Sequence, residues 1–333
     1  MATNPSDGLT PSQLEAFHRD GYLIIPDALP PSTVSALLAE THRLLDTLDL
    51  TSHPLTRFRT GGEDGTDHTG DDYFLTSGDK IRFFLEDDAF DAAGTLTKPK
   101  HRAVNKIGHY LHALSPPFAA LLTPPSNSTT TATPPTTSIT PHPTAIARSL
   151  AFTAPRVLQS MIICKQPEIG GAVPPHQDST FLYTDPPSAV GFWYALEDAT
   201  LENGCLSFLP GSHRWAPIAR RLVRREGGAG GTEMVGNEEE GGRFPRPRFD
   251  GEYGEGLRGE GEGEGEGEYV PGEVKAGALV LIHGNLLHKS ERNLSQKGRI
   301  IYTFHVIEGG EGFEYDERNW LQPPEEGFTK LYG

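Results

Sequence analysis

The sequence of 333 residues lacks several features that mark particular classes of protein. It has no run of about 18 apolar residues, and its mean hydropathy is -0.43, which argues against a transmembrane helix. Its two cysteines, Cys164 and Cys205, are too few for a disulfide framework or a four-cysteine zinc site. We expect both to be buried as small apolar side chains.

Targeting signals are also missing. The first residues show no basic segment followed by an apolar one, so we expect no secretory signal. The C-terminal residues TKLYG differ from the peroxisomal tripeptide SKL, which weighs against a peroxisomal location. Together with the few cysteines, this favours a reduced intracellular setting, and we expect a cytoplasmic protein.

Positive charge is in short supply. Lys and Arg number 29 against 45 Asp and Glu, which gives a formal net charge of -16. The segment 226–268 alone holds 13 of these acids and 4 Arg. The rest of the chain is therefore only mildly acidic. We expect neither nucleic acid nor a membrane surface as a partner, since both attract basic proteins.

Two stretches of low complexity interrupt an otherwise globular pattern. Residues 124–147 are rich in Thr, Pro and Ser, and residues 226–268 end in a Gly-Glu repeat. Neither stretch can bury enough apolar surface to offset the entropy lost on ordering, so both are predicted to be disordered insertions that act as spacers. The remainder suits one large domain that spans 1–333.

The remaining pattern predicts a few helices followed by many short strands. A capping box at Thr10 opens the first helix, and further elements are expected at 22–25 (strand), 32–48 (helix) and 104–122 (helix). From residue 155 onward, apolar runs separated by Gly, Pro and Asn predict strands at 157–165, 179–183, 190–196, 204–209, 278–283 and 299–307. Without regularly alternating helices, this pattern favours an antiparallel jelly roll over a doubly wound sheet.

The most informative motif is Pro175-His176-Gln177-Asp178. Residues two apart on a strand point to the same side, so His176 and Asp178 can aim an imidazole nitrogen and a carboxylate oxygen at one point. A second imidazole would complete the set of two His and one carboxylate that binds Fe(II) on one face and leaves three positions open. By itself, a His-X-Asp tripeptide is more often a surface ion pair.

A second segment, residues 281–305, offers the missing imidazole and a cation. It contains two candidate ligands, His283 and His288, followed by Arg299 at the start of an apolar strand. The guanidinium of Arg299 can pair with a carboxylate through two hydrogen bonds, although alone it is an ordinary strand-end charge. Zinc hydrolases use similar donor sets, so these residues do not decide which metal is bound.

Beyond these residues, the sequence resembles the phytanoyl-CoA dioxygenase family of Fe(II)/2-oxoglutarate oxygenases. It is most similar to the branch called phytanoyl-CoA dioxygenase domain-containing proteins. The matching blocks run in order from near residue 11 to about 308, and their number rather than any single block carries the resemblance. They are DGYLIIPDALP, GDKIRFFLED, NKIGHYLHAL, VLQSMIICKQPEIGG, PPHQDSTFLYTDP, EDATLENGCLSFLPGSH, LIHGNLLHKSERNLS and GRIIYTFH.

The resemblance implies a double-stranded β-helix, a cupin-like jelly roll, with iron bound by His176, Asp178 and His288. The spacing in the family selects His288 over His283. Family members place this ligand shortly before a small residue or Ser and eleven residues before the Arg, and His288, Ser290 and Arg299 fit this spacing. Arg299, helped by Ser290, would then bind the distal carboxylate of 2-oxoglutarate.

Three further residues match positions that line the cosubstrate pocket in similar proteins, namely Lys106, Met161 and Trp193. Taken alone, Lys106 is an ordinary exposed lysine on a predicted helix, and Met161 and Trp193 are core residues of apolar strands. Ser290 alone would be a turn cap. Their assignment to the cosubstrate therefore depends on the resemblance.

The implied reaction is an O2-dependent oxidation, most simply the hydroxylation of a small organic or acyl substrate, with release of succinate and CO2. Asp178 favours hydroxylation, because related halogenases lack the carboxylate. Ascorbate is expected to support turnover. A catalytically silent metal- or ligand-binding barrel and a scaffold that works through the insertions remain as alternatives. The prime substrate, the acceptance of acyl-CoA and the oligomeric state stay open.

Three remaining features are interpreted as structural. His213, in PGSHRW, is expected in a turn and is a candidate for the border of the substrate mouth. His305 lies at even spacing from Arg299 but outside the ligand set. The Arg cluster of residues 220–225 (RRLVRR) is predicted to be a solvated helix face. A contact of that cluster with a phosphorylated substrate such as an acyl-CoA is the alternative.

Overall fold

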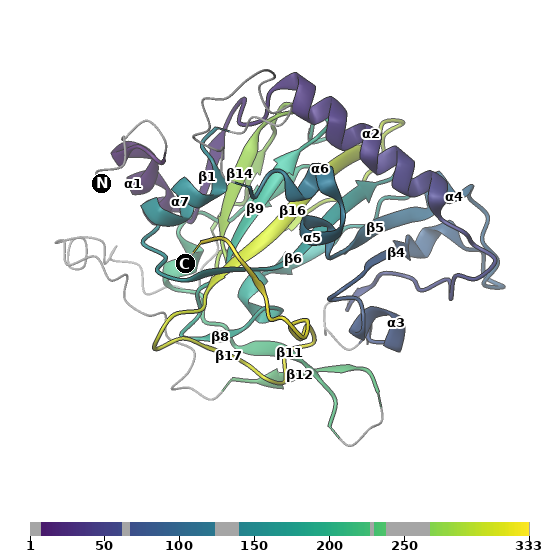
Figure 1. Ribbon diagram of the computed structural model, residues 1–333. Coiled ribbons are helices and arrows are strands. Elements are labelled where there is room, and N and C mark those ends of the chain that lie inside the picture. The colour runs from purple at the N-terminus through teal and green to yellow at the C-terminus, as the bar shows by residue number, and fades with distance from the viewer. Residues whose placement is uncertain (1–7, 62–66, 124–139, 227–229, 238–266, 333) are drawn as a thin grey trace, which may run out of the picture.

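Two antiparallel sheets form the centre of the protein, and helices cover one side of the larger sheet (Figure 1). Within the residues that the structure describes, no helix is both long enough and apolar enough to cross a membrane. The computed structural model describes residues 8–61, 67–123, 140–226, 230–237 and 267–332.

The larger sheet has the strand order β1-β14-β9-β16-β6-β5-β4, with β18 paired to β6. Its two longest strands, β6 and β16, pair from Lys165 opposite Arg299 to Pro155 opposite Glu308, with one irregularity near Phe304. The strands are β1 (Tyr22–Ile25), β4 (Ile81–Leu85), β5 (Val104–His109), β6 (Pro155–Lys165), β9 (Val190–Ala195), β14 (Leu279–His283), β16 (Arg299–Glu308) and β18 (Thr329–Lys330).

The smaller sheet faces the larger one and has the order β13-β10-β15-β7. An apolar cluster joins Trp193, Val280 and Ile301 of the larger sheet to Leu206 and Phe208 of the smaller sheet. This packing of two antiparallel sheets confirms the predicted jelly roll. The smaller sheet consists of β7 (Val173–His176), β10 (Leu206–Phe208), β13 (Val270–Gly272) and β15 (His288–Ser290).

The opposite face of the larger sheet packs against helices, with α2 lying along it (Figure 1). Leu37 and Leu45 of α2 and Phe118 of α6 belong to the same apolar cluster as Tyr302 and Phe304 of β16. The helices therefore cover one face of the larger sheet, and its other face points toward the smaller sheet. The helices are α1 (Pro11–Asp20), α2 (Pro31–Thr47), α3 (Asp72–Leu75), α4 (Lys100–Ala103), α5 (Leu111–Leu114), α6 (Pro116–Ala119) and α7 (Pro143–Ser149).

Short elements complete the chain. The capping box that opens α1 is present, since the Thr10 hydroxyl accepts from the Gln13 N–H and the Gln13 side chain accepts from the Thr10 N–H. Two-stranded pairs and short 3-10 turns lie in the connections between the larger elements. These are β2 (Thr60–Gly61), β3 (Asp67–His68), β8 (Thr184–Asp185), β11 (Arg220–Arg224), β12 (Thr232–Gly236) and β17 (Glu314–Tyr315), with 3-10 turns at Asp87–Ala89, Asp178–Thr180 and Ser212–Arg214.

Three of the predicted elements are wrong. Residues 104–109 form strand β5 instead of the first turns of a helix, because β4 and β6 flank the segment and pair with its backbone on both sides. The strand predicted at 179–183 is absent from these residues, which begin in a 3-10 turn. The Arg cluster 220–225 lies on β11, paired with β12, rather than on a helix face.

The low-complexity stretches are shorter than predicted where the structure describes them. Residues 143–147 belong to α7, in which Ile146 and Ala147 are fully buried. Residues 232–236 form β12. The predicted ends of both insertions are corrected accordingly. Most of the remainder of 124–147 and of 226–268 lies outside the described residues.

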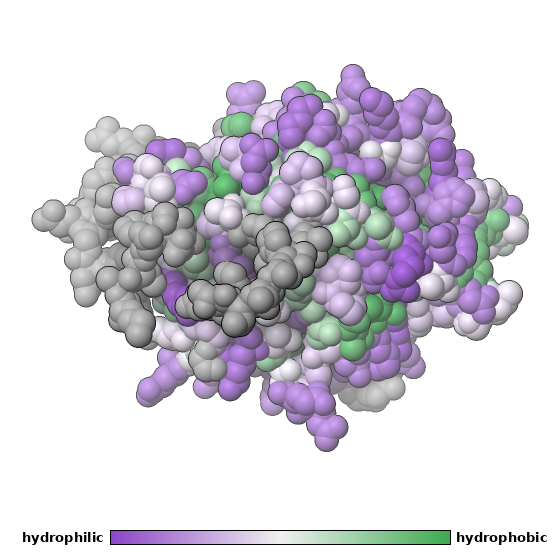
Figure 2. Space-filling model, turned by 45° about the horizontal axis from the view of Figure 1, so that its top comes forward, coloured by the Kyte–Doolittle hydropathy of each residue, from purple (hydrophilic) through white to green (hydrophobic). Residues whose placement is uncertain are grey.

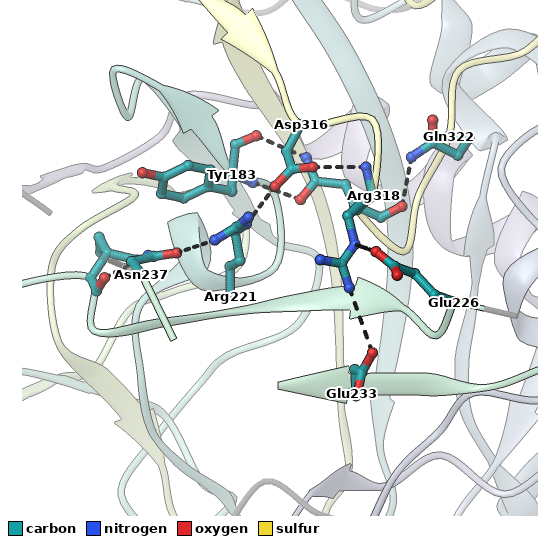
Figure 3. A network of polar contacts seen from close by, with 10 residues as sticks. Tyr183, Arg221, Glu226, Glu233, Asn237, Asp316, Arg318 and Gln322 are labelled. Carbon is teal, nitrogen blue, oxygen red and sulfur yellow. Dashed lines mark hydrogen bonds and ion pairs between the residues drawn. The ribbon is translucent and has the colours of Figure 1, made fainter. Parts of the chain in front are cut away.

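An arginine of the cluster on β11 forms an ion pair with the C-terminal segment (Figure 3). Arg221 forms an ion pair with Asp316 of the C-terminal segment. From the same segment, Arg318 lies 3.3 Å from Glu226 and 3.6 Å from Glu233. These pairs tie the β11-β12 hairpin to the C-terminal segment and support the structural interpretation of the cluster.

On the face drawn in Figure 2, hydrophilic residues predominate, and hydrophobic ones lie between them in smaller groups. Large apolar side chains that are exposed come from separate parts of the chain, which is normal for a folded surface. They are Leu114, Leu201, Trp215, Val270 and Leu294.

Candidate metal centre

Pairing between β7 and β15 brings the two predicted histidine ligands together. His176 ends β7, His288 begins β15, and the two residues are opposite each other in the antiparallel register. Their imidazole ring centroids are 4.2 Å apart. Asp178 follows β7 directly and opens a 3-10 turn, so its side chain returns toward the same point.

The three side chains converge as donors around one position. Asp178 Oδ1 lies 3.6 Å from His176 Nε2 and 3.7 Å from His288 Nε2. One ligand atom from each residue falls within 4.8 Å of the others. Two imidazole nitrogens and one carboxylate oxygen are the donor set that suits a non-haem Fe(II) ion with open positions.

Backbone carbonyls fix the tautomers of both imidazoles. His176 Nδ1 donates to the Pro174 carbonyl at 2.9 Å, and His288 Nδ1 donates to the Leu286 carbonyl at 3.0 Å. A carbonyl can only accept, so Nδ1 carries the proton and Nε2 keeps its lone pair for a metal. Burial, followed by the nearby His176, lowers the pKa of His288 to about 4, and the ring is neutral near pH 7.

Asp178 is held in its ionised form and in one orientation. Burial disfavours its charge, but His288 and His305 outweigh this effect and hold the pKa of Asp178 well below its ordinary value. His305 Nε2 donates to Asp178 Oδ2 at 3.2 Å, which leaves Oδ1 facing the two histidines. Gly191 makes room for this contact, because a Cβ atom there would lie 3.3 Å from Asp178 Oδ2.

His305 is thus part of the centre without belonging to the ligand set. Even spacing along β16 predicts that it faces the same side as Arg299, and both residues line the cavity described below. Its Nδ1 lies 3.4 Å from Gln159 Nε2, which can donate to it and leave the ring proton on Nε2. The sequence pattern therefore located His305 but gave no sign of its contact with Asp178.

One cavity of about 610 Å³ contains the triad and the predicted cosubstrate residues. Strand alternation places Met161 of β6, Trp193 of β9 and Ser290 of β15 on its wall, together with Lys106 and Arg299. Every residue that the resemblance assigned to metal or cosubstrate therefore lines the same space, whereas the alternative ligand His283 is not among the described lining residues. The roles of these residues are taken up below.

Arg299 is buried at the end of the cavity with part of its guanidinium unused. Only 3% of the residue is exposed, and burial lowers its pKa to about 10, so it remains a cation near pH 7. Nε and Nη2 donate to the Gly204 carbonyl at 3.0 and 2.7 Å. Nη1 is buried and has no hydrogen-bond partner among the described residues. A ligand carboxylate is a suitable acceptor for it.

Lys106 is buried on β5, so the interpretation as an exposed helical lysine is wrong. Its ammonium lies 3.5 Å from the centre of the Phe58 ring, a cation–π contact. Burial lowers the pKa of Lys106 to about 7, against the opposing effect of Asp178. Lys106 therefore lines the cavity from the larger sheet, within reach of the charge of Asp178.

Two charged residues in the cavity wall were missed from the sequence. Lys165, the last residue of β6, is 4% exposed and donates to Ser290 Oγ at 2.7 Å. Glu86 follows β4, accepts from the Gly171 N–H at 3.3 Å, and has its pKa raised to about 7 by burial. The alternation Met161, Ile163, Lys165 was the available signal for Lys165, but buried lysines are rare.

His283 and His213 lie apart from the triad. His283 stacks on Phe17 at 6.1 Å and lies 4.9 Å from His213. His213 is in the expected turn, where its Nε2 contacts the His18 carbonyl at 3.0 Å. It is not among the described residues that line the cavity, so it does not border this part of a substrate mouth.

Comparison with known proteins shows which family has this arrangement. Residues 17–301 match the model of the family Phytanoyl-CoA dioxygenase (PhyH). The chain belongs to the phytanoyl-CoA dioxygenase family. The resemblance predicted from the sequence is confirmed, and with it the class of Fe(II)/2-oxoglutarate oxygenase.

Relatives match over nearly the whole chain. Phytanoyl-CoA dioxygenase domain-containing protein 1 of Bos taurus is 42% identical over 328 residues, which cover 97% of this chain and 99% of the relative. Phytanoyl-CoA dioxygenase of Arabidopsis thaliana is 37% identical over 314 residues, which cover 94% of each chain. The shared length includes both sheets and the candidate metal centre.

Solved structures share the fold at low sequence identity. The non-haem alpha-ketoglutarate-dependent epimerase SnoN from nogalamycin biosynthesis has a TM-score of 0.54 at 16% identity, covering 97% of this chain and 98% of its own. EctD from S. alaskensis, solved with 2-oxoglutarate and 5-hydroxyectoine, has a TM-score of 0.51 at 18% identity, covering 92% and 78%. These likenesses concern the jelly-roll architecture.

Proposed function

We propose that the protein is an Fe(II)- and 2-oxoglutarate-dependent dioxygenase that hydroxylates a small organic or acyl substrate, with release of succinate and CO2. The observation that carries this proposal is the convergence of His176, Asp178 and His288 in the same cavity as the buried Arg299. Fe(II) held there would supply the redox chemistry that couples decarboxylation of the 2-oxo acid by O2 to oxidation of the substrate.

The chain's own residues prepare this site for metal and cosubstrate. His288 presents a neutral imidazole and Asp178 an ionised oxygen, so binding a divalent cation requires no proton release from these two groups near pH 7. His176 presents its Nε2 atom, because its Nδ1 atom donates to a backbone carbonyl. We assign the distal carboxylate of 2-oxoglutarate to Arg299 and Ser290. Lys106, Met161 and Trp193 are proposed as further cosubstrate contacts.

An apolar wall leaves room for a prime substrate. Four aromatic side chains line the cavity, from the segment before β2, helix α3, the turn after β7 and the C-terminal segment, namely Phe58, Phe74, Phe181 and Trp320. Aromatic rings bury large apolar surfaces, so they suit an apolar or aromatic part of a substrate. The proposal therefore concerns a substrate with a substantial hydrocarbon portion.

The proposed domain organisation follows from the same strands. The larger sheet takes strands from before residue 124, from 155–195 and from after 268, which makes the low-complexity stretches connections within one domain. We propose that residues 1–333 form one oxygenase domain in which these stretches are spacers.

The decisive experiment measures succinate formed by the Fe(II)-loaded protein with 2-oxoglutarate, O2 and ascorbate, without a prime substrate. We expect slow turnover that stops without O2 and is abolished by Asp178→Ala, because the substitution removes one of three ligands. Thermal unfolding of the variant serves as the control for folding. Unchanged succinate release by metal-loaded Asp178→Ala protein would contradict the assignment. Binding of Fe(II) and 2-oxoglutarate without any succinate would indicate a catalytically silent barrel.

A further inference from the structure

Two buried basic side chains lie directly opposite each other in the wall of the cavity. Lys165 of β6 and Arg299 of β16 are paired in the antiparallel register, and both side chains line the cavity. They are 4% and 3% exposed. Like charges opposite each other on neighbouring strands repel, and burial strengthens the repulsion because it removes solvent screening.

Acidic side chains do not compensate these two charges at close range. Burial and the charge of Arg299 lower the pKa of Lys165 to about 7, against the opposing effects of Glu86 and Glu291. Among the described residues, no ion pair joins Lys165 or Arg299 to a carboxylate. Buried charges in proteins are normally paired, so this arrangement points to an anionic ligand as the missing partner. Independently, Nη1 of Arg299 is buried and has no hydrogen-bond acceptor among the described residues, which also points to an anionic ligand.

Ser290 connects the two cations to the proposed cosubstrate site. Lys165 Nζ donates to Ser290 Oγ at 2.7 Å, so this hydroxyl oxygen already accepts and its proton is free to point elsewhere. An ammonium has three N–H groups, and the one directed at Ser290 leaves others for a second acceptor. Lys165, Ser290 and Arg299 therefore each have an N–H or O–H group available for a ligand, and together they suit the two oxygens of a carboxylate.

We propose that Lys165 binds the distal carboxylate of 2-oxoglutarate together with Arg299 and Ser290, and thereby selects dicarboxylic over monocarboxylic 2-oxo acids. This inference rests on the proposed function, because it assigns a residue to the same cosubstrate. The second cation supplies the charge complement of the distal carboxylate, a group that a monocarboxylic 2-oxo acid lacks.

A purely structural role for Lys165 is the competing explanation. Its aliphatic carbons pack closely beside Gly204, where an added Cβ atom would lie 2.9 Å from Lys165 Cε. Replacement by Met keeps most of this apolar stem and removes the ammonium group, with its charge and its N–H donors. Lys165→Met therefore separates the packing of the side chain from its ammonium group.

The test compares two ligands of equal chain length. Calorimetric titrations under argon measure the binding of 2-oxoglutarate and of 2-oxopentanoate, which lacks the distal carboxylate, to the Fe(II)-loaded protein. Lys165→Met is expected to weaken 2-oxoglutarate binding about 10- to 100-fold, the loss typical of a charged hydrogen bond. Binding of 2-oxopentanoate should change by less than about twofold. Lys275→Met, which removes a lysine whose side chain is 85% exposed, is the matched control.

The possible outcomes distinguish this inference from the proposed function. If Lys165→Met binds 2-oxoglutarate as tightly as the wild type, Lys165 is not a cosubstrate contact and the oxygenase proposal stands. An equal loss for both acids would also overturn the inference, since it indicates a general structural defect. Failure of the wild-type protein to bind either acid would refute the proposed function itself. Should Lys165→Met fail to fold, Lys165→Gln, which retains a neutral donor, is subject to the same criteria.

Discussion

The carboxylate of Asp178 is oriented by a histidine from the larger sheet, His305 of β16. His305 donates to Oδ2 of Asp178, and Gln159 contacts the second nitrogen of the His305 ring. Groups that orient a ligand in this way normally strengthen metal binding, because the ligand does not have to be ordered when the metal arrives. The centre therefore extends beyond the three donor residues.

This contact makes a testable prediction for metal affinity. His305→Ala removes the donor to Asp178 and should weaken the binding of Fe(II), measured under argon by calorimetry, about 10- to 100-fold. His305→Gln retains an N–H donor of similar reach and should recover much of the affinity. His101→Ala, at an exposed position, is the control. Unchanged Fe(II) affinity in His305→Ala would show that the contact does not orient the ligand.

The sequence predicted the donor set better than the charged residues around it. His176 and Asp178 share a motif, and the resemblance selected His288, so these three positions needed no knowledge of distant contacts. Lys165 and Glu86 could not be selected in the same way. Their significance arises from burial, which depends on strands far apart in the sequence.

At the scale of the elements, strands with continuous apolar runs were predictable and the segment around Lys106 was not. Strands β6, β9, β14 and β16 contain runs of apolar residues and lie within a few residues of their predicted bounds. Residues 104–109 mix Asn, Lys, Gly and His with two apolar residues, a composition that does not favour a strand. Pairing with β4 and β6 overrides this local preference.

The start of β6 and the end of β16 are joined through Glu308. Its carboxylate accepts from the N–H groups of Thr153, Ala154 and Gly310 at 2.6, 2.8 and 2.8 Å. Burial favours its neutral form, but these backbone hydrogen bonds outweigh burial and lower the pKa of Glu308 below its ordinary value of 4.5. A carboxylate with a lowered pKa stabilises the folded state at pH values above 4.5 and loses this effect as the pH falls through the lowered pKa.

Glu308→Gln should therefore destabilise the protein in a pH-dependent way. We expect a loss of about 2 kcal/mol in the free energy of unfolding near neutral pH, because the amide keeps only one acceptor oxygen for these N–H groups and its hydrogen bonds are neutral. The difference from the wild type should shrink as the pH falls from 4.5 through the lowered pKa, because the carboxylate is protonated first in the unfolded state and then in the folded state. Urea unfolding followed across this range measures it. A difference that does not vary with pH would contradict the role given to the charge.

At the scale of the whole molecule, one sheet is assembled from parts of the chain that the low-complexity stretches separate. Strands β4 and β5 precede residue 124, β6 and β9 follow it, and β14 and β16 come after residue 268. Composition alone predicted that these stretches lie outside the core, but their bounds depended on tertiary contacts. Pro143–Ser149 became helical because Ile146 and Ala147 are buried against the core.

The described residues on either side of segment 124–139 lie close together. His142 Nε2 is 3.2 Å from the Thr123 carbonyl, so the chain leaves and re-enters the domain at neighbouring points. The interpretation of the segment as a spacer then predicts that it can be replaced by a short Gly/Ser linker. On this interpretation, shortening the connection about fourfold should change the free energy of unfolding by about 1.2 kcal/mol at most, in the stabilising direction.

Thermal unfolding and succinate release of this linker variant provide the measurements, and both should match the wild type closely. Ile146→Ala in the adjacent helix α7 is the positive control, since loss of a fully buried side chain costs about 2–5 kcal/mol. A linker variant that is destabilised as much as Ile146→Ala would show that segment 124–139 packs on the domain. Such a result would replace the spacer interpretation by a structural role, because a connection that contributes no contacts has nothing to lose on removal.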